Sequence, residues 1–280
     1  MYMKSVKYLF ASAAIVVAAC TQTPEERIKA FEEAHNSMME EYGQMMDSLS
    51  TDPAKAEAYY NDFVEKYIEF NLKAAKKNPD NMVAVQVLMN LRGLVDDAQV
   101  NDIISGMSPE LLENETVKSL KKGLDARAAT SEGKMFTDFT VNSVVGQTRS
   151  IPPQPKYAEV KLSDYVGKGK YILLDFWSPW CGPCRREMPN IKAVYDKYKG
   201  DKFDVVSIAV WEREPVDVTI ETAAKLGMDW NQINNGGREP AELYGVEGIP
   251  HLILFGPDGT ILKRGFHGAE IEEGVSSYLK

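Results

Sequence analysis

The segment YILLDFWSPWCGPCRREMP, residues 171–189, places two cysteines three positions apart directly after a run of apolar residues. The run is broken by one charged residue, Asp175, and is typical of a buried central strand. The residues after the turn are apolar at helical spacing: Met188, Ile191, Val194, Tyr195 and Tyr198. We therefore expect a buried strand, a short turn, and a helix that begins near Cys181.

The two cysteines either pair with each other or stay free. The remaining cysteine of the chain, Cys20, lies far upstream of Cys181 and Cys184. A zinc site would need two further ligands, and none of the histidines is at ligand spacing from the pair: His35, His251 and His267. A disulfide across so short a loop removes little entropy from the unfolded chain, whereas its rapid and reversible closure suits redox exchange.

The predicted helix start gives the two thiols different properties. Unpaired backbone N–H groups and the positive end of the helix dipole stabilise a thiolate at the N-terminus, where Cys181 falls. This lowers the pKa of Cys181 and makes it the attacking group. Cys184, one turn further on, lies on the same helix face within reach of the first sulfur.

The N-terminus has the features of an export signal. Lys4 and Lys7 precede an apolar stretch of eleven residues, 9–19, which is too short to span a bilayer. The sequence VVAAC then ends on Cys20 and resembles the lipobox of bacterial lipoproteins. This resemblance implies a signal peptide at 1–19, lipidation of Cys20, and a lipid anchor in the periplasm-facing cell envelope, where disulfides persist. The alternative is an ordinary secretory signal with a chance cysteine.

Length and charge limit the organisation and the partners. A chain of 280 residues favours two domains, and its formal charge of −9 argues against a nucleic-acid partner. The region after Cys20 predicts several antiparallel helices, beginning with Thr23 as the cap of a helix with Pro24 at its first position. Apolar residues then recur every three or four positions. We expect an all-helical domain at 20–130, used for docking or as a spacer, and a second domain at 131–280.

Strand, turn, WCGPC and helix together resemble thioredoxin. Asp175 matches the buried aspartate of that family, and Pro189 matches the proline inside its active-site helix. Downstream, VEGIPHLILFGPDGTILKRGF resembles the family's cis-proline loop and closing hairpin, with Ile249 and Pro250 at the matching positions. The resemblance implies an α/β thioredoxin-like fold, with a central mixed sheet flanked by helices.

A closer resemblance is to the envelope-anchored TlpA/ResA-like thiol-disulfide oxidoreductases. Glu187, in CRREMP, matches the active-site glutamate of that branch. The lead-in FTDFTV, residues 136–141, and then VKLSDYVGKGKYILLDFW, residues 160–177, resemble its extra N-terminal β-hairpin. As alternatives, Glu187 is an ordinary surface acid, and His251, where thioredoxins usually carry a small residue, is a solvated loop histidine. The resemblance covers about half of the chain, residues 135–280.

The resemblance also implies roles for the site residues. Cys181 and Cys184 form the redox couple, so no cofactor or metal is expected. Asp175, together with Glu187, accepts the proton of Cys184. The substrate-binding positions would be Trp180, Gly182, Pro183, Ile249 and Pro250. Trp180 could equally serve packing alone.

Three classes of function remain open. A reductase would be kept reduced by a membrane thiol donor and would act on disulfides of envelope proteins such as apocytochrome c. An oxidase or isomerase would use the same cysteines, and a binding module would use the helical domain. The Gly182–Pro183 dipeptide matches reducing thioredoxins and favours reduction, while a peroxidase is disfavoured because no separate peroxidatic cysteine is present.

Overall fold

The computed structural model describes residues 22–151 and 154–279, and the predicted signal peptide and Cys20 lie outside them. The chain separates into two compact units, Met1–Lys118 and Ser119–Lys280, each described here by itself. Among the described residues, no helix combines the length and the hydropathy of a membrane span.

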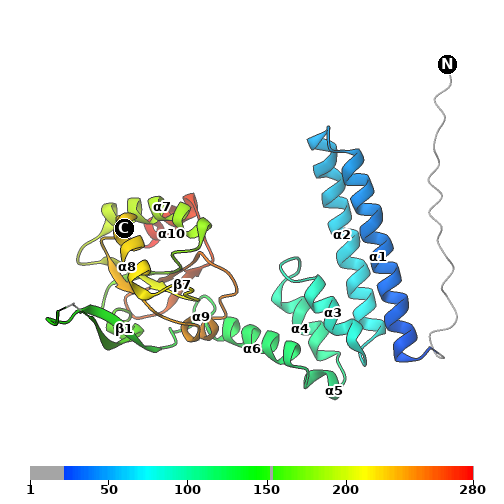
Figure 1. Ribbon diagram of the computed structural model, residues 1–280, viewed down its shortest axis with the longest axis horizontal. Coiled ribbons are helices and arrows are strands. Elements are labelled where there is room, and N and C mark those ends of the chain that lie inside the picture. The colour runs from blue at the N-terminus through cyan, green and yellow to red at the C-terminus, as the bar shows by residue number, and fades with distance from the viewer. Residues whose placement is uncertain (1–21, 152–153, 280) are drawn as a thin grey trace. The chain divides into compact units, whose positions relative to one another are not determined.

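The first unit is helical, and Figure 1 shows its two longest helices side by side. Its helices are α1 (Pro24–Ser48), α2 (Pro53–Lys77), α3 (Met82–Asn90), α4 (Asp97–Ser105) and α5 (Pro109–Leu112). Thr23 caps α1 as the sequence predicts: its hydroxyl accepts the Glu26 N–H, and the Glu26 carboxylate accepts the Thr23 N–H.

Aromatic contacts join α1 to α2. The rings of Phe31 and Phe70 stack with centroids 5.5 Å apart, and those of Tyr42 and Phe63 are 4.2 Å apart. His35 belongs to the same seam, since its Nε2 lies 3.0 Å from the Tyr67 hydroxyl. The histidine is therefore hydrogen-bonded inside the helical unit, where it has a structural role.

The second unit contains a two-stranded hairpin and a five-stranded mixed sheet. The hairpin pairs β1 (Thr140–Gln147) with β2 (Pro155–Lys161) in antiparallel fashion. The sheet has the order β5-β4-β3-β6-β7, with β3, β4 and β5 parallel and β6 and β7 antiparallel to their neighbours. Its strands are β3 (Tyr171–Trp177), β4 (Phe203–Ala209), β5 (Asn231–Ile233), β6 (His251–Phe255) and β7 (Ile261–Arg264).

Apolar clusters cover both faces of this sheet. On one face pack α7 (Gly182–Tyr198), α8 (Val216–Lys225) and α10 (Ala269–Tyr278), and Figure 1 shows α7 and α10 next to each other. On the other pack the hairpin, the short 3₁₀ helix Leu162–Asp164 and α9 (Glu239–Leu243). Because side chains alternate along a strand, β3 directs Leu173, Asp175 and Trp177 to the α7 face. A mixed sheet, flanking helices and an extra hairpin are the architecture that the sequence predicts.

The helix α6 (Glu115–Ala129) lies mostly within the second unit. Arg127 forms an ion pair with Glu247 at 2.8 Å. Gly245 makes the close approach possible, because it has a φ of +60° and a Cβ on it would lie 2.7 Å from the Gly123 carbonyl oxygen. Arg264 then holds the end of the helix by donating to the Thr130 carbonyl oxygen at 2.8 Å. The predicted domain boundary at 130/131 therefore falls after a helix that the structure packs against the sheet domain.

Candidate active site

The two cysteines lie where β3 leads into α7. Cys181 is the N-cap of α7, and its sulfur forms a disulfide with Cys184 at 2.06 Å. The Cys184 backbone N–H also donates to the Cys181 sulfur at 3.1 Å. Cys184 is fully buried, whereas Cys181 is 3 % exposed. Cys181 is thus the sulfur nearer to solvent, with a helix N-terminus and an N–H donor suited to stabilising a thiolate.

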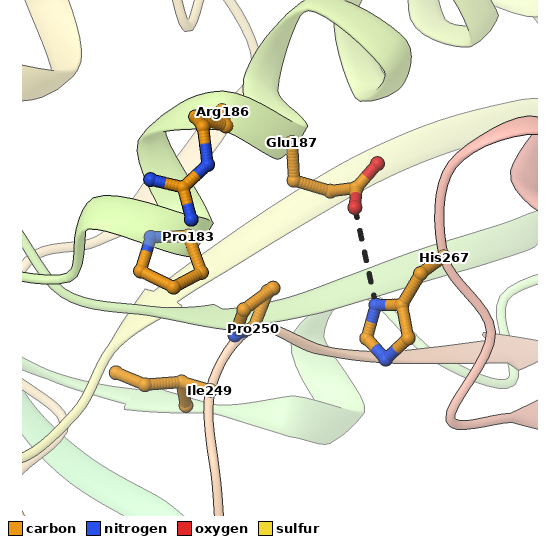
Figure 2. Close-up of a pocket in the computed structure, with 6 residues that line it drawn as sticks. All are labelled: Pro183, Arg186, Glu187, Ile249, Pro250 and His267. Carbon is orange, nitrogen blue, oxygen red and sulfur yellow. Dashed lines mark ion pairs between the residues drawn. The ribbon is translucent and has the colours of Figure 1, made fainter. Parts of the chain in front are cut away.

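The loop before β6 closes over the outer sulfur. The peptide bond between Ile249 and Pro250 is cis, as expected for this loop, and the Ile249 carbonyl oxygen lies 3.5 Å from the Cys181 sulfur. An open pocket of about 470 Å³ lies beside this loop (Figure 2). Its lining residues come from α7 and from the loops before β6 and α10: Pro183, Arg186, Glu187, Ile249, Pro250 and His267. Three of the five predicted substrate-binding residues therefore line one pocket.

Glu187 is held in this pocket and is not a freely solvated acid. Its side chain is only 11 % exposed. Its Oε1 accepts hydrogen bonds from Asn190 Nδ2 at 2.7 Å and from the Gly268 N–H at 3.0 Å. His267 Nδ1 lies 4.0 Å from Oε2, and Figure 2 shows the two side chains facing each other. Glu187 thereby links α7 to Gly268, the residue directly before α10.

Asp175 is completely buried on the sheet face that carries the disulfide. Its Oδ2 accepts a hydrogen bond from the Ser207 hydroxyl at 2.8 Å, whereas its Oδ1 has no partner among the described residues. Burial raises the pKa of Asp175 to about 7, the Ser207 hydrogen bond opposes the rise, and the charge of Glu187 adds to it. A carboxyl group that changes protonation near neutral pH is suited to proton transfer.

Ser207 and Trp230 are members of the site that the sequence reasoning missed. The Trp230 indole N–H donates to the Ser207 hydroxyl oxygen at 2.8 Å, so Trp230, Ser207 and Asp175 form one chain of hydrogen bonds. A signal for Ser207 exists, since it is a buried polar residue inside the apolar strand FDVVSIA. Trp230 stands just before β5 and carries no comparable signal.

Trp180 lies at the solvent edge of the disulfide. It is 37 % exposed, and its indole N–H donates to the Trp211 carbonyl oxygen at 3.0 Å. The Arg213 guanidinium lies 3.9 Å from the centre of the ring. The segment after β4 therefore fixes the orientation of Trp180, a role for Trp211 and Arg213 that the sequence did not suggest.

His251 differs from its expected place in a solvated loop. It is the first residue of β6, is only partly exposed, and meets the Phe176 ring edge-on with centroids 6.4 Å apart. Arg264 Nη2 donates to His251 Nε2 at 3.3 Å. Burial first, and the positive charge of Arg264 second, lower the pKa of His251 to about 4. The ring is therefore neutral near neutral pH.

The remaining residues named from the sequence lie on α7. Gly182 and Pro183 are the first two residues of α7, and Pro189 lies inside that helix. Within the described parts of the chain, no group of three or more His, Cys, Asp or Glu side chains is placed to hold a metal ion. The chemistry available here is that of two sulfurs beside a buried carboxyl group and an open pocket.

Comparisons with known proteins concern mainly the second unit. The AhpC/TSA family matches residues 133–264. Thiol-disulfide oxidoreductase ResA of Bacillus thuringiensis subsp. konkukian is 27% identical over 149 residues, which cover 53% of this chain and 76% of that protein. The ResA protein of Bacillus subtilis is 29% identical over 138 residues, covering 49% of this chain and 68% of that protein.

A solved structure is similar over more of the chain. The crystal structure of a thioredoxin-like protein from Bacteroides caccae matches with a TM-score of 0.53 at 19% identity, and covers 80% of this chain and 83% of that one. At this identity the similarity concerns the fold, and it agrees with the thioredoxin-like architecture that the sheet order and the hairpin define.

Proposed function

We propose that this chain is a thiol-disulfide oxidoreductase that reduces protein disulfides in the bacterial cell envelope. The match of residues 133–264 to the AhpC/TSA family supports this proposal. One observation carries the proposal. Cys181 and Cys184 form a disulfide at the N-terminus of α7, and the outer sulfur faces the loop that contains Pro250. The relatives named thiol-disulfide oxidoreductase ResA support the same chemistry.

In the proposed reaction the Cys181 thiolate attacks one sulfur of a substrate disulfide. The substrate S–S bond breaks, a mixed disulfide forms, and the first substrate sulfur leaves as a thiolate that takes a proton from solvent. Cys184 then gives its proton to Asp175 and attacks the Cys181 sulfur, which releases the second substrate thiolate. The substrate gains two electrons, and the Cys181–Cys184 couple loses them. A membrane thiol donor would reduce the couple again.

The surrounding residues have supporting roles in this proposal. Glu187 adjusts the pKa of Asp175 through its charge, and it ties α7 to the start of α10. Trp180 and Ile249 form an apolar collar around the outer sulfur. Pro183 and Pro250 line the pocket that would receive the substrate backbone. Gly182, the first residue of α7, would contact the substrate beside them.

The location in the cell is also part of the proposal. Lipidation of Cys20 would anchor the chain to a membrane and keep it in the envelope, facing the periplasm. There a disulfide reductase would serve proteins that must be reduced before assembly, such as apocytochrome c. The helical unit, residues 22–118, would act as a spacer or a docking element.

A direct test is the reduction potential of the couple. After equilibration in defined thiol-disulfide buffers, a potential near the roughly −270 mV of thioredoxin, or lower, would support reduction. A value near the roughly −120 mV of a strong disulfide donor would instead make the protein an oxidase.

Trapping gives a second test, which also covers the binding-module alternative. The C184S variant cannot resolve the mixed disulfide and should retain envelope proteins through Cys181. The matched C181S variant, which lacks the attacking sulfur, should retain none. Equal capture by both variants would contradict the assigned order of attack, and capture by neither would contradict the proposed activity.

A further inference from the structure

We propose that Ser207 and Trp230 are positioning residues for Asp175, which hold Oδ2 as a hydrogen-bond acceptor and leave Oδ1 as the oxygen that receives the proton. The inference rests on the proposed function, in which Asp175 accepts the proton of Cys184. It adds the atom that carries the proton and the residues that select it.

The free oxygen of Asp175 follows from which groups donate and which accept in the hydrogen bonds among Trp230, Ser207 and Asp175. The Trp230 indole nitrogen can only donate, so the Ser207 hydroxyl oxygen must accept at this 2.8 Å contact. The single hydroxyl proton of Ser207 then points to Asp175 Oδ2, also at 2.8 Å. Since Oδ2 already accepts a hydrogen bond from Ser207, Oδ1 is the oxygen left free to take up a proton.

The burial of these groups makes the arrangement rigid. Ser207 and Asp175 are fully buried, and Trp230 is 6 % exposed. Parallel pairing of β3 with β4 sets Asp175 opposite Ser207. The Trp230 ring packs against Tyr195 of α7 with centroids 5.3 Å apart. In a site without access to solvent, a donor that is fixed in this way costs no rearrangement when the carboxyl group ionises.

Few other groups act on the carboxyl group. Among the described residues, Ser207 is the one hydrogen-bond donor that contacts the Asp175 carboxyl group. On the neighbouring strand β6, the residue paired with Asp175 is the apolar Leu252. Of the titratable groups on α7, Glu187 is the one whose charge raises the pKa of Asp175. Cys181 and Cys184 stand at the start of that helix. In the oxidised protein the cysteines do not titrate, which leaves Glu187 as the charged neighbour.

The test measures the Asp175 pKa directly in the oxidised full chain. The protein is labelled with ¹³C at the aspartate carboxyl carbons, and the D175N variant identifies the Asp175 resonance. In S207A the titration midpoint should rise by about one pH unit, the shift expected from losing one hydrogen bond to a charged group. The S207T variant keeps a hydroxyl and should return the midpoint to the wild-type value.

A matched control uses another buried hydroxyl. Thr219 on α8 is buried, and its hydroxyl has no hydrogen-bond partner among the described residues. T219V removes that hydroxyl without a change in volume and should leave the Asp175 midpoint unchanged. An equal shift in T219V and S207A would show a general response to mutation and would overturn the proposal.

Trp230 is tested through its dependence on Ser207. W230F keeps an aromatic ring but removes the N–H donor, so it should raise the midpoint by less than S207A does. In the double variant S207A/W230F the midpoint should equal that of S207A, because Trp230 acts through Ser207. The double variant should also be more stable than S207A, which leaves the indole N–H buried without an acceptor.

The outcomes separate this inference from the proposed function. A midpoint in S207A equal to that of the wild type, or additive shifts in the double variant, would overturn the positioning roles whatever the activity of the protein. The midpoints are measured on the oxidised protein without substrate. A chain that reduces no disulfide but shows the expected shifts would instead contradict the proposed function alone.

Discussion

The Trp180 indole N–H donates a hydrogen bond to the Trp211 carbonyl oxygen at 3.0 Å, which fixes the exposed ring beside the disulfide to the segment after β4. Trp211 has a φ of +55°, an uncommon conformation for a residue other than glycine. Its own N–H donates to the Gly237 carbonyl oxygen at 3.0 Å. The backbone after β4 is thus shaped so that one carbonyl group orients Trp180.

We expect the W180A variant to bind protein substrates more weakly. The ring forms part of the surface around the outer sulfur, and truncation of a tryptophan that is a binding hot spot weakens binding by about tenfold or more. KM for a protein disulfide should rise, while kcat and the rate with a small disulfide change little. W180F is the matched control, since it keeps an aromatic six-membered ring while it loses the pyrrole part of the indole with its N–H donor. An unchanged KM in W180A would assign Trp180 to packing alone.

The position of α6 predicts where the sheet domain can be cut. A fragment of residues 119–280 retains the Arg127–Glu247 ion pair and the close contact of Gly123 with Gly245. A fragment of residues 131–280 loses both, along with the hydrogen bonds from Arg264 to Thr130. We therefore expect the longer fragment to unfold at a higher urea concentration. Equal midpoints would place the functional boundary at 130/131, where the sequence alone set it.

Tryptophan fluorescence is a suitable signal for such measurements. The four tryptophans of the chain all belong to the second unit: Trp177, Trp180, Trp211 and Trp230. A urea transition followed by this signal therefore reports on the sheet domain and not on the helical unit.

Local patterns were sufficient to predict the elements that carry the cysteines. An apolar run with one acid, a turn and a helical repeat predicted β3, α7 and the position of Cys181 at the helix start. The helix cap at Thr23 was also readable, because a capping box involves only neighbouring residues. These features depend on a few consecutive positions.

The missed residues depend on contacts between distant segments. Ser207 meets Asp175 because β3 and β4 pair in one particular register, which neither strand specifies by itself. Trp230 reaches Ser207 from the segment before β5, 23 residues away in sequence. His251 follows the cis-proline loop, yet it is partly buried because Arg264 of β7 and Phe176 of β3 lie against it. Contacts of this kind depend on how all the strands of the sheet pair, which no single segment of the sequence specifies.

Asp175 should make the sheet domain less stable as the pH rises. Its pKa is about 7 in the folded protein against a reference value of 3.8, so the folded state binds more protons between these values. The stability that Asp175 contributes is then complete below about pH 4, and on the order of 4 kcal/mol of it is lost as the pH rises to about 7. The D175N variant lacks this loss, because its side chain does not ionise. It should be the more stable protein at pH 8 and should lose most of that advantage at pH 4.

The measurement is urea unfolding of the oxidised protein from pH 4 to pH 8, followed by tryptophan fluorescence. E187Q is the matched control, because it removes the charge that raises the pKa of Asp175 and keeps the buried carboxyl group. Its difference from the wild type should be smaller than that of D175N, with the same sign at pH 8. A difference between D175N and the wild type that does not vary with pH would show that Asp175 ionises as it does in the unfolded chain.

His251 should have the opposite dependence over nearly the same range. Burial and Arg264 lower its pKa to about 4 from a reference of 6.5, so the unfolded state binds the proton first as the pH falls. The stability that this group contributes is complete above pH 6.5, and on the order of 3 kcal/mol is lost as the pH falls to about 4. In the wild type this trend opposes that of Asp175 and flattens the profile between pH 4 and pH 6.5. H251N, measured in the same way, should expose the Asp175 slope, with stability falling steadily as the pH rises. If H251N and the wild type instead had parallel profiles, His251 would be protonated in the folded protein near pH 6, and the hydrogen bond from Arg264 to its Nε2 could not persist there.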